Sequence, residues 1–411
     1  MNTLVVLGGA DGAITTLRAA RRLGVRTICV DGRTEAPAAR EADEFLHCST
    51  ADLGAIVASL GERKDLVGVV SPASDVNLPS QAALSRLLNL GHEVSAAAIR
   101  ASVDKAFFRS VSDILRLPGP RFVHGTSAQV IQQAWRVPFP VIVKPNDLGG
   151  GRGITRCASP DEVPAAAALA EALSPSGTVI LEEFLCGTDL GMEAVIVNGE
   201  VALLGVSRRV LSPAPHFATL GHDMSPGSAD LLDHVRSMLE RICSELDYRG
   251  GSLNADLLIT DSGEVVLLEM GTRLGGNGVA ELLGLVNGVD VTEAYVRMAI
   301  GAPVDLTPRA ARFAASRVLT SDITGTLFGW LGLERLAAVP EVADIIITAV
   351  PGDLVEPYTH CRAKLGFVLA VADEPHQLAS ALATVTDLVQ PEVAPVALLM
   401  DESRQPQVVE A

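Results

Sequence analysis

Short apolar runs and helical patterns alternate along the first part of the chain. Runs of strand-forming residues occupy 4–7, 26–30 and 67–70, and a pattern with helical spacing covers about 14–23. Strands that alternate with helices in this way favour βαβ units, whose strands are parallel. We therefore expect an α/β domain with a parallel sheet over about residues 1–100.

A second region with a different pattern follows. A helix is expected to begin within 102–109 and to end before 118–120, and 141–145 reads as a short buried strand. Residues 178–185 are expected to form a strand that runs into a loop, and Asn198-Gly199 is a hairpin-turn signal. These elements indicate a second domain over about residues 101–300.

The composition shifts slightly after Gly301-Ala302-Pro303. Apolar runs at 344–350 and 366–371 predict further strands. The remaining chain, 301–411, is expected to form a third and smaller α/β lobe, and no internal repeat is present.

A predicted hairpin near residue 260 places two carboxylates side by side. The apolar segments 254–260 and 265–269 read as strands joined by a tight Ser262-Gly263 loop. If that loop has two residues, Asp256 lies directly opposite Glu269. Like charges in that position destabilise a sheet, but a divalent cation between them reverses the effect, and hard oxygen ligands suit magnesium that carries phosphates. The alternative is that one carboxylate points into water.

Composition narrows the class of protein. The 411 residues are 48% hydrophobic and only 4% aromatic, which is typical of a globular α/β protein with an aliphatic core. A net charge of −17 argues against a nucleic-acid partner, because most of the surface would repel a phosphate backbone. No apolar run reaches membrane-spanning length, and the N-terminus lacks a basic leader. We expect a cytoplasmic protein without a membrane partner, whose six dispersed cysteines are reduced.

The glycine-rich turn at 8–12, with Asp31 after the next strand, is a partial dinucleotide-binding motif. The complete G-x-G-x-x-G is absent, so we interpret the glycines as a tight strand-to-helix turn. A nicotinamide-dependent oxidoreductase remains an alternative class, and it predicts that the protein binds NAD.

Basic and glycine residues are spaced as a bound triphosphate would require. Lys105 stands at a helix start, Lys144 ends a strand, and four glycines follow within 149–153. Backbone N–H groups of such a loop can surround phosphate oxygens while ammonium groups neutralise their charge. Singly, each lysine is more often a solvated surface residue.

The order and spacing of a longer series resemble the ATP-grasp superfamily, over about residues 100–300. The matching positions are, in chain order, Lys105, Lys144, the loop Gly149, Gly150, Gly151, Arg152 and Gly153, then Glu182, Glu183, Phe184 and Leu185, followed by Asp189, Asp256, Glu269 and Arg273. The resemblance implies an ATP-grasp fold with an N-terminal parallel-sheet domain before it and a smaller C-terminal α/β lobe after it. It also implies ATP and Mg²⁺, or Mn²⁺, as cofactors.

The resemblance assigns roles to the nucleotide-binding positions. Lys105 and Lys144 would contact the α- and β-phosphates, and the loop Gly149–Gly153 would close over them. Glu182, within the 182–185 segment, would accept a hydrogen bond from the adenine amino group. The backbone of Phe184 and Leu185 would bind the edge of the ring. Asp189 would take the ribose hydroxyls, where the family usually places Glu.

By the same resemblance Asp256 and Glu269 become magnesium ligands, and Arg273 lies beside the transferred phosphoryl group. The family motif Glu-x-Asn-x-Arg reads Glu-Met-Gly-Thr-Arg here, so Gly271 replaces a metal-binding Asn. The register that pairs Asp256 with Glu269 also pairs Asn254 with Gly271. We hypothesise that Asn254 supplies the missing amide oxygen. Asn277 and a water molecule are the alternatives.

The predicted reaction activates a carboxylate as an acyl phosphate, which an amine then attacks. The segment 212–226 is similar to the substrate loop of L-amino-acid ligases, and Arg317 and the segment 364–367 are similar to their C-terminal lobe. Within the loop, His216 and His222 would orient a substrate or accept a proton near neutral pH. The alternative is that both are exposed loop residues without a chemical role.

Arg208 and Arg209, at the end of the preceding strand, could bind a substrate carboxylate. Both are more often surface charges.

The sequence therefore predicts a three-lobed ATP-dependent carboxylate–amine ligase that forms an amide or peptide bond and releases ADP and phosphate. Its partners are small-molecule carboxylate and amine substrates, with a homodimer left open. Two other functions remain: a ligase that loads a thiol on a carrier protein, and a nucleotide-binding module that has lost turnover. The identity of the substrates is not encoded in these patterns.

Overall fold

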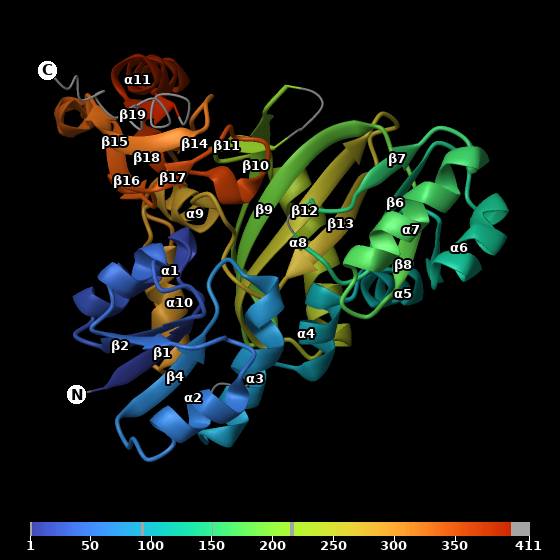
Figure 1. Ribbon diagram of the computed structural model, residues 1–411, viewed down its shortest axis with the longest axis horizontal. Helices are drawn as coiled ribbons and strands as arrows, with labels where there is room; N and C mark the ends of the chain where they lie inside the picture. Colours follow the sequence, from blue (N-terminus) through green and yellow to red (C-terminus); the bar gives the residue numbers. More distant parts are fainter. Residues whose placement is uncertain (1, 92–93, 150, 214–217, 396–411) are drawn as a thin grey trace, which may run out of the picture.

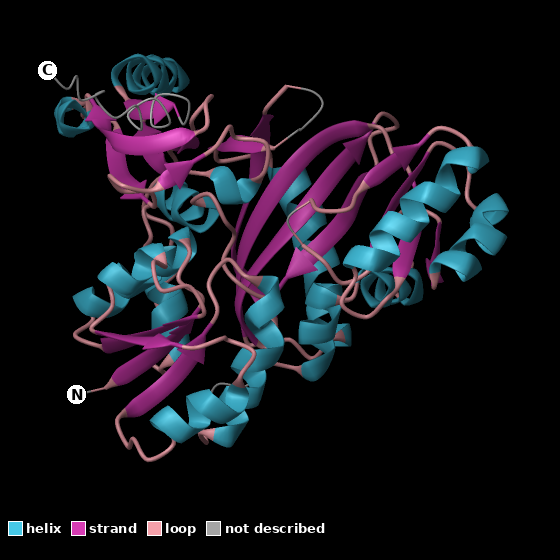
Figure 2. Ribbon diagram, in the orientation of Figure 1, coloured by secondary structure: helices cyan, strands magenta, loops and turns pink. Residues whose placement is uncertain are grey.

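A computed structural model describes residues 2–91, 94–149, 151–213 and 218–395. Four β-sheets organise the chain, and helices lie on their faces (Figures 1 and 2). No helix within these residues is both long and apolar enough to cross a bilayer. All six cysteines are free. The mixed α/β fold with an N-terminal parallel sheet, which the sequence predicted, is confirmed.

The N-terminal domain holds a four-stranded parallel sheet with strand order β3-β2-β1-β4. Its elements are β1 (Thr3–Leu7), α1 (Asp11–Arg22), β2 (Arg26–Asp31), β3 (Glu44–His47), α2 (Leu53–Leu60), β4 (Leu66–Val70) and α3 (Leu78–Leu87). The Asp31 carboxylate accepts from the Gly9 amide at 2.7 Å and pairs with Arg33. These contacts show Asp31 closing the turn between β1 and α1.

A small antiparallel sheet, order β5-β8-β6-β7, forms a lobe of its own, which we call the 122–183 lobe. Its elements are β5 (Phe122–Gly125), α6 (Ser127–Gln133), β6 (Val141–Pro145), β7 (Thr155–Cys157), α7 (Val163–Leu173) and β8 (Val179–Glu183), and it is preceded by α4 (Ala96–Val103) and α5 (Lys105–Ile114). Val141, Val143, Val179 and Leu181 occupy alternate positions of β6 and β8 and are buried in a separate core.

The largest sheet has eight strands in the order β13-β12-β9-β10-β11-β14-β18-β16. Its strands and associated helices are β9 (Gly187–Val197), β10 (Glu200–Leu211), β11 (Thr219–Met224), α8 (Ala229–Glu245), β12 (Gly250–Thr260), β13 (Val265–Gly271), α9 (Val279–Asn287), α10 (Val291–Ala299), β14 (Phe313–Leu319), β16 (Val342–Ile347) and β18 (Gly366–Ala372). The hairpin turn predicted at Asn198-Gly199 is confirmed, with both residues at positive φ. Because β14, β16 and β18 extend the sheet past residue 300, the last two lobes share one backbone framework.

The rest of the C-terminal lobe is a three-stranded sheet and a helix. They comprise β15 (Gly325–Leu331), β17 (Leu354–Val355), α11 (Pro375–Leu388) and β19 (Gln390–Pro395), with sheet order β17-β15-β19. The strands predicted at 344–350 and 366–371 correspond to β16 and β18. Strand β18 is fully buried, as expected for a central strand covered on both faces.

The β12–β13 hairpin has the predicted pairing but not the predicted loop. Asp256 lies opposite Glu269 and Asn254 opposite Gly271, as expected. The loop, however, has three residues, 261–263, closed by hydrogen bonds between Thr260 and Glu264. A bulge between Asp256 and Leu257 then moves the register by one residue. The two-residue loop is therefore wrong, and the bulge compensates for it before the carboxylates are reached.

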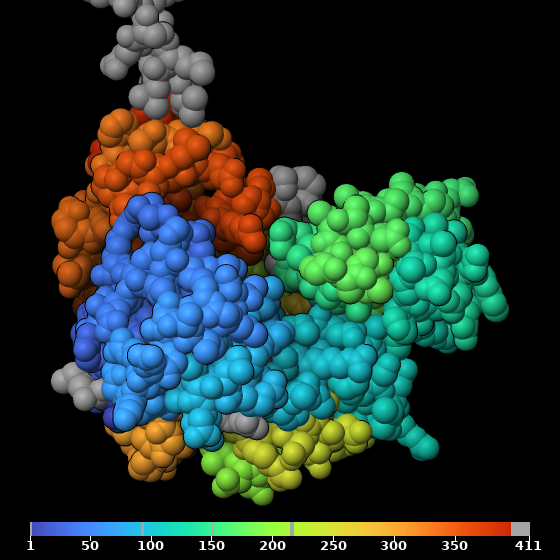
Figure 3. All heavy atoms as spheres, turned by 60° about the horizontal axis from the view of Figure 1, so that its bottom comes forward, coloured from blue at the N-terminus to red at the C-terminus, as the bar shows by residue number. Residues whose placement is uncertain are grey.

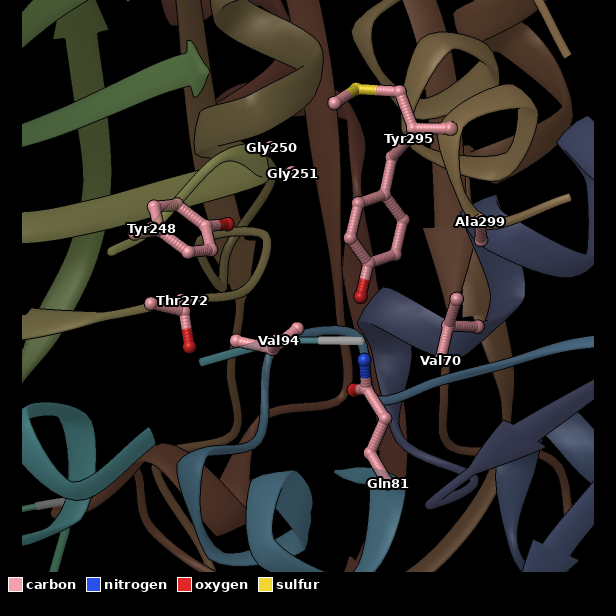
Figure 4. Close-up of a pocket in the computed structure, with 10 residues that line it drawn as sticks. Val70, Gln81, Val94, Tyr248, Gly250, Gly251, Thr272, Tyr295 and Ala299 are labelled. Atoms are coloured by element: carbon pink, nitrogen blue, oxygen red, sulfur yellow. The ribbon is translucent and has the colours of Figure 1, made fainter. Parts of the chain in front are cut away.

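The joint between the N-terminal domain and the large sheet is tightly packed. Gln81 from α3, Tyr248 and Tyr295 point into a small cavity that is also lined by Val70 and Thr272 (Figure 4). The cavity measures about 10 Å³. That volume is on the order of a single water molecule, so the joint has no room for an organic ligand.

Candidate active site

The paired carboxylates lie on the face of the large sheet that is turned toward the 122–183 lobe. Figure 3 shows a recess between that lobe, in green, and the blue N-terminal domain. The Asp256 side chain is 25% exposed and that of Glu269 is 49% exposed. Burial, together with Glu269, raises the pKa of Asp256 to about 6 although Arg209 opposes the shift. Burial also acts on Glu269, but Lys105 and Lys144 outweigh it and lower its pKa.

Arg209 on β10 lies between two of the acids. Its guanidinium contacts Asp256, and its second nitrogen is 3.5 Å from the Asp189 carboxylate. Arg208, the preceding residue, faces the other side of the sheet and pairs with Asp223 at 2.5 Å. Because side chains alternate along a strand, only Arg209 points to the same side as the predicted ligands. That side is the groove between the 122–183 lobe and the large sheet.

Lys105 is the first residue of α5 and joins the helix to the groove. Asp104 caps the helix by accepting a hydrogen bond from the Phe107 amide, which fixes the start of the helix at Lys105. The Lys105 ammonium donates to the carbonyl of Leu148, the residue before the glycine loop, at 3.0 Å and lies 3.9 Å from Glu269. A single cation thus contacts both the base of the loop and one carboxylate of the pair.

Lys144 and Glu182 come together on neighbouring strands of the 122–183 lobe. The Lys144 ammonium is 2.6 Å from Glu182, whose other oxygen accepts from Arg109 at 2.6 Å. Burial penalises the Glu182 carboxylate, but Arg109 and Lys144 dominate and lower its pKa to about 2. Arg109 also donates to the carbonyls of Leu267 and Leu268, so it ties α5 to both sheets.

In the segment at the end of β8 that the resemblance assigns to the adenine ring, some groups already have partners within the protein and others do not. The Phe184 amide donates to the Pro140 carbonyl at 2.9 Å, and Arg156 stacks on the Phe184 ring. The Glu183 carboxylate accepts from the Arg121 amide at 3.4 Å. The amide of Leu185 has no hydrogen-bond partner among the residues that the structure describes, so it is a backbone donor left open at this edge.

The glycine loop connects β6 to β7. Gly151 and Gly153 have φ of +73° and +71°, a conformation that glycine adopts without strain. A Cβ on Gly149 or Gly151 would meet nothing within 4 Å, whereas one on Gly153 would meet Leu173 at 2.8 Å. The loop therefore stands open at its tip and is packed at its base. Gly150 lies outside the described residues.

Arg273 is held from two sides. It forms a bidentate pair with Asp75 of the N-terminal domain, both distances being 2.9 Å, and donates to the Asn254 amide oxygen at 2.7 Å. The Asn254 nitrogen donates to Met192 O and to Glu193. Asn254 thus faces the groove, with its oxygen directed at Arg273.

Glu193 lies beneath this cluster and was not predicted from the sequence. The side chain is fully buried and accepts from Asn254, Ser252 and the Gly275 amide at 2.9 Å. Burial raises its pKa to about 7. A lone acid inside the apolar run 190–197 was the available signal, since an unsupported buried carboxylate is costly. Arg109 and Asp75 were not predicted either, because their partners are distant in sequence. Arg209 was predicted as a possible ligand of a substrate carboxylate, but its pairing with Asp256 and Asp189 was not.

His222 lies on β11 and is buried, so the alternative of an exposed loop residue is wrong for it. Its Nδ1 is 3.0 Å from the Ser207 hydroxyl, and its amide donates to Ser316. Burial, with Arg209, Arg317 and Lys364 nearby, lowers its pKa to about 3. The expected titration near neutral pH is therefore wrong as well. His216 lies outside the described residues.

Asn277, the other candidate for the missing amide ligand, has a different partner. Its side-chain oxygen accepts from Lys364 at 2.7 Å, and the same ammonium pairs with Asp11 at 2.5 Å. Asp11 begins α1, so this contact joins the N-terminal domain, the loop before α9 and the C-terminal lobe.

The donor set fits a metal that arrives with phosphates. Within the described residues, no three His, Cys, Asp or Glu side chains form a cluster that could enclose an ion. Two opposed carboxylates alone suit Mg²⁺, which is usually bound by one or two carboxylates with phosphate oxygens and water completing its octahedron. Asp256 and Glu269 are the residues that would hold it.

Two known families match separate parts of the chain. The carbamoyl-phosphate synthase L chain ATP-binding domain matches residues 104–307. The L-amino acid ligase C-terminal domain 2 matches residues 317–394.

Relatives match over most of their length. An uncharacterized protein of Sinorhizobium fredii is 27% identical over 89% of this chain and 77% of its own length. A formate-dependent phosphoribosylglycinamide formyltransferase of Synechococcus sp. is 28% identical over 82% of this chain and 86% of its own length.

Solved structures share the fold at lower identity. The L-amino acid ligase of Bacillus licheniformis is 18% identical with a TM-score of 0.78, and the match covers 96% of this chain and 99% of that chain. The biotin carboxylase domain of the Hydrogenobacter thermophilus 2-oxoglutarate carboxylase, solved with MgADP, is 16% identical with a TM-score of 0.79, and the match covers 95% and 91%. These structures share the fold of the chain. Together with the family matches over residues 104–307 and 317–394, they show that the chain belongs to the ATP-grasp superfamily.

Proposed function

We propose that this protein is an ATP-dependent ligase that activates a carboxylate as an acyl phosphate and transfers the acyl group to the amine of an amino acid or peptide. One observation supports it above others: Asp256 and Glu269 face each other beside Lys105, in a chain whose C-terminal region matches an L-amino acid ligase domain. The products are an amide or peptide, ADP and phosphate.

The nucleotide would lie in the groove between the 122–183 lobe and the large sheet. Asp256 and Glu269 would hold Mg²⁺, which when bound offsets the charge of the phosphate oxygens. Lys105 and Lys144 would neutralise the α- and β-phosphates. The loop with Gly149, Gly150, Gly151 and Gly153 would cover them, since backbone amides in such a loop can approach an anion closely. Glu182, Phe184, Leu185 and Asp189 would bind the nucleoside.

Arg273 would stabilise the charge that develops during phosphoryl transfer. Its bidentate pair with Asp75 already fixes the guanidinium, so little reorganisation is required. Asn254 is the proposed substitute for the family's metal-binding Asn. In that role the Asn254 oxygen would release Arg273 and bind the metal instead. An Asn254→Ala variant with unchanged magnesium dependence would refute the proposal.

His222 would orient a substrate rather than remove a proton, because a group with a pKa of about 3 is a weak base at neutral pH. Because Nδ1 contacts Ser207, Nε2 is the ring nitrogen that would contact a substrate. His216 is proposed to act at the same substrate loop.

One observation favours a different carboxylate as the substrate. The named relatives that match most of the chain are formate-dependent formyltransferases. Formate, activated in the same way and passed to an amine, is therefore the competing assignment.

A phosphate-release assay with ATP and Mg²⁺ tests the proposal. Pairs of amino acids are screened against formate with amines, and products are identified by mass spectrometry. Release that requires both members of an amino-acid pair supports the ligase, and release with formate selects the competitor. If no small-molecule pair triggers release, the amine-ligase assignment fails, and a carrier-protein thiol becomes the acceptor to test.

Asp256→Asn and Glu269→Gln are the matched variants for this assay. Each keeps the shape of the side chain and removes one negative charge, so the fold should persist while the metal is held less well. We expect a loss of about 10²-fold or more in turnover, the range seen when one electrostatic contributor is removed. Retained activity in both variants would dismiss the groove as the site of chemistry.

A further inference from the structure

A ligand-sized cavity lies outside the groove, where the three lobes meet. It has a volume of about 460 Å³ and is bounded by α1, α9, the start of α10 and the strands β16 and β18. Figure 1 shows α1 beneath the C-terminal lobe, with α10 beside it. Small-molecule sites typically measure roughly 300–1,000 Å³ and occur where domains meet.

None of the groove residues lines this cavity. The cavity lies close to the Lys364 contact instead. Thr15 lies one turn after Asp11 on α1, and Glu281 on α9 follows Asn277, which is in the loop before that helix. Asp11 and Asn277 both contact Lys364, so the cavity and the joint of the three lobes are built on the same two segments of the chain.

Glu281 supplies a carboxylate to the wall. It accepts from the buried Thr292 hydroxyl at 3.0 Å. Across residues 2–91, 94–149, 151–213 and 218–395 no Lys, Arg or His nitrogen lies within 4 Å of it. Burial raises its pKa, because no neighbouring cation compensates for the lost hydration. A positively charged group entering the cavity would find this carboxylate uncompensated.

The rim carries three arginines and two aspartates. Arg18, Arg22 and Arg312 border the cavity together with Asp290 and Asp344. Arg18 pairs with Asp344 and, at 3.1 Å, with the half-buried Glu41. Arg22 and Arg312 pair with Asp290 and Asp373, which are 46% and 78% exposed, and exposed pairs of this kind are weak. The guanidinium groups of Arg22 and Arg312 therefore remain available to a carboxylate ligand, which they can bind with two parallel hydrogen bonds.

Apolar side chains complete the lining between the two charged regions. Leu285, Val289, Val291 and Leu369 form these walls. A purely anionic ligand would face Glu281, and a purely cationic one would face three arginines. A molecule with an ammonium group, a carboxylate and an apolar body complements all three parts of the lining.

We propose that this cavity is a second small-molecule site that binds a free amino acid, with the ammonium group at Glu281, the carboxylate at the rim arginines and the side chain against Leu285 and Leu369. Binding here needs neither ATP nor Mg²⁺. The proposal is independent of the ligase reaction, and either one can fail without the other.

Isothermal titration of the full chain with L-leucine, without nucleotide or metal, tests the site. Leucinamide, which lacks the carboxylate, and 4-methylpentanoate, which lacks the amine, are the matched probes. We expect leucine to bind at least tenfold more tightly than either. Equal binding of all three, or no binding of leucine, would overturn the proposal.

Two variants separate this cavity from the groove. Glu281→Gln should weaken leucine binding at least tenfold, and Leu285→Trp should block the cavity. Glu264 is an exposed acid beside the hairpin loop, and Glu264→Gln and Asp256→Asn should both leave leucine binding unchanged. Leucine binding that survives both cavity variants would belong to the groove and would refute the site. A loss of phosphate release in Asp256→Asn, measured separately, concerns only the ligase.

Discussion

Glu182 illustrates how a single residue can have a structural role in a predicted binding site. Its carboxylate is 5% exposed and lies between Arg109 and Lys144. Removing one member of a buried group of paired charges leaves its partners without a compensating charge. Glu182 therefore stabilises α5 and the strands of the 122–183 lobe, besides its proposed contact with adenine.

Glu182→Gln should lower the free energy of unfolding by about 3–5 kcal/mol at neutral pH. The folded pKa of about 2 lies below the ordinary value of 4.5, so the carboxylate contributes its full stabilisation above pH 4.5 and loses it as the pH falls toward 2. Urea unfolding at neutral pH and at about pH 3.5 measures both effects. The difference between wild type and variant should shrink at the lower pH.

Glu183→Gln is the control, since its carboxylate accepts only a long bond from the Arg121 amide. A Glu182 effect that is no larger than the Glu183 effect, or that grows on acidification, would contradict this account of the buried pair.

The β12–β13 hairpin shows how an element is defined by its turn and its bulge together. The three-residue loop places Gly263 at φ +84°, and the bulge then restores the facing pair of Asp256 and Glu269. A Cβ on Gly263 would meet nothing within 4 Å. Substitution there tests backbone conformation alone.

Gly263→Ala should destabilise the protein by about 1 kcal/mol, because the left-handed conformation costs an L-residue 1–2 kcal/mol and the loss of chain entropy in the unfolded state offsets part of it. Gly263→Asn should cost less, since Asn tolerates this region. Thermal unfolding of both variants is the measurement. Equal stability of Ala and Gly at this position would mean that the loop adopts another conformation.

On the scale of the whole molecule, Lys364 joins segments that are far apart in the chain. It pairs with Asp11, 353 residues away, and with Asn277. Both charged side chains are 10% exposed. The contact links the C-terminal lobe to α1, whereas the continuous eight-stranded sheet links it to the central strands.

A double-mutant cycle measures this link. Lys364→Met should destabilise by about 3 kcal/mol because it leaves the Asp11 carboxylate buried without its cation. Asp11→Asn in the same chain should recover part of that loss, with a coupling energy on the order of 1 kcal/mol or more. Urea unfolding measures the free energy of unfolding of each variant. If the effects of the two substitutions on this free energy are additive, the two groups do not interact.

The amino-acid sequence determined the features that depend on local patterns. Alternating apolar runs defined the parallel N-terminal sheet, and the β12–β13 hairpin placed Asp256 opposite Glu269, because neighbours in a hairpin are near in sequence. The order of glycine, lysine and acidic motifs identified the superfamily.

Tertiary structure alone decided which side chains meet across elements. It placed Arg209 against Asp256 and Asp189, Arg273 against Asp75, and Glu193 beneath Asn254. It also buried His222, whose titration a sequence pattern cannot reveal. These contacts join strands and lobes whose pairing depends on the complete packing of the chain, and the free energy of a charge depends on the burial and partners that such packing creates.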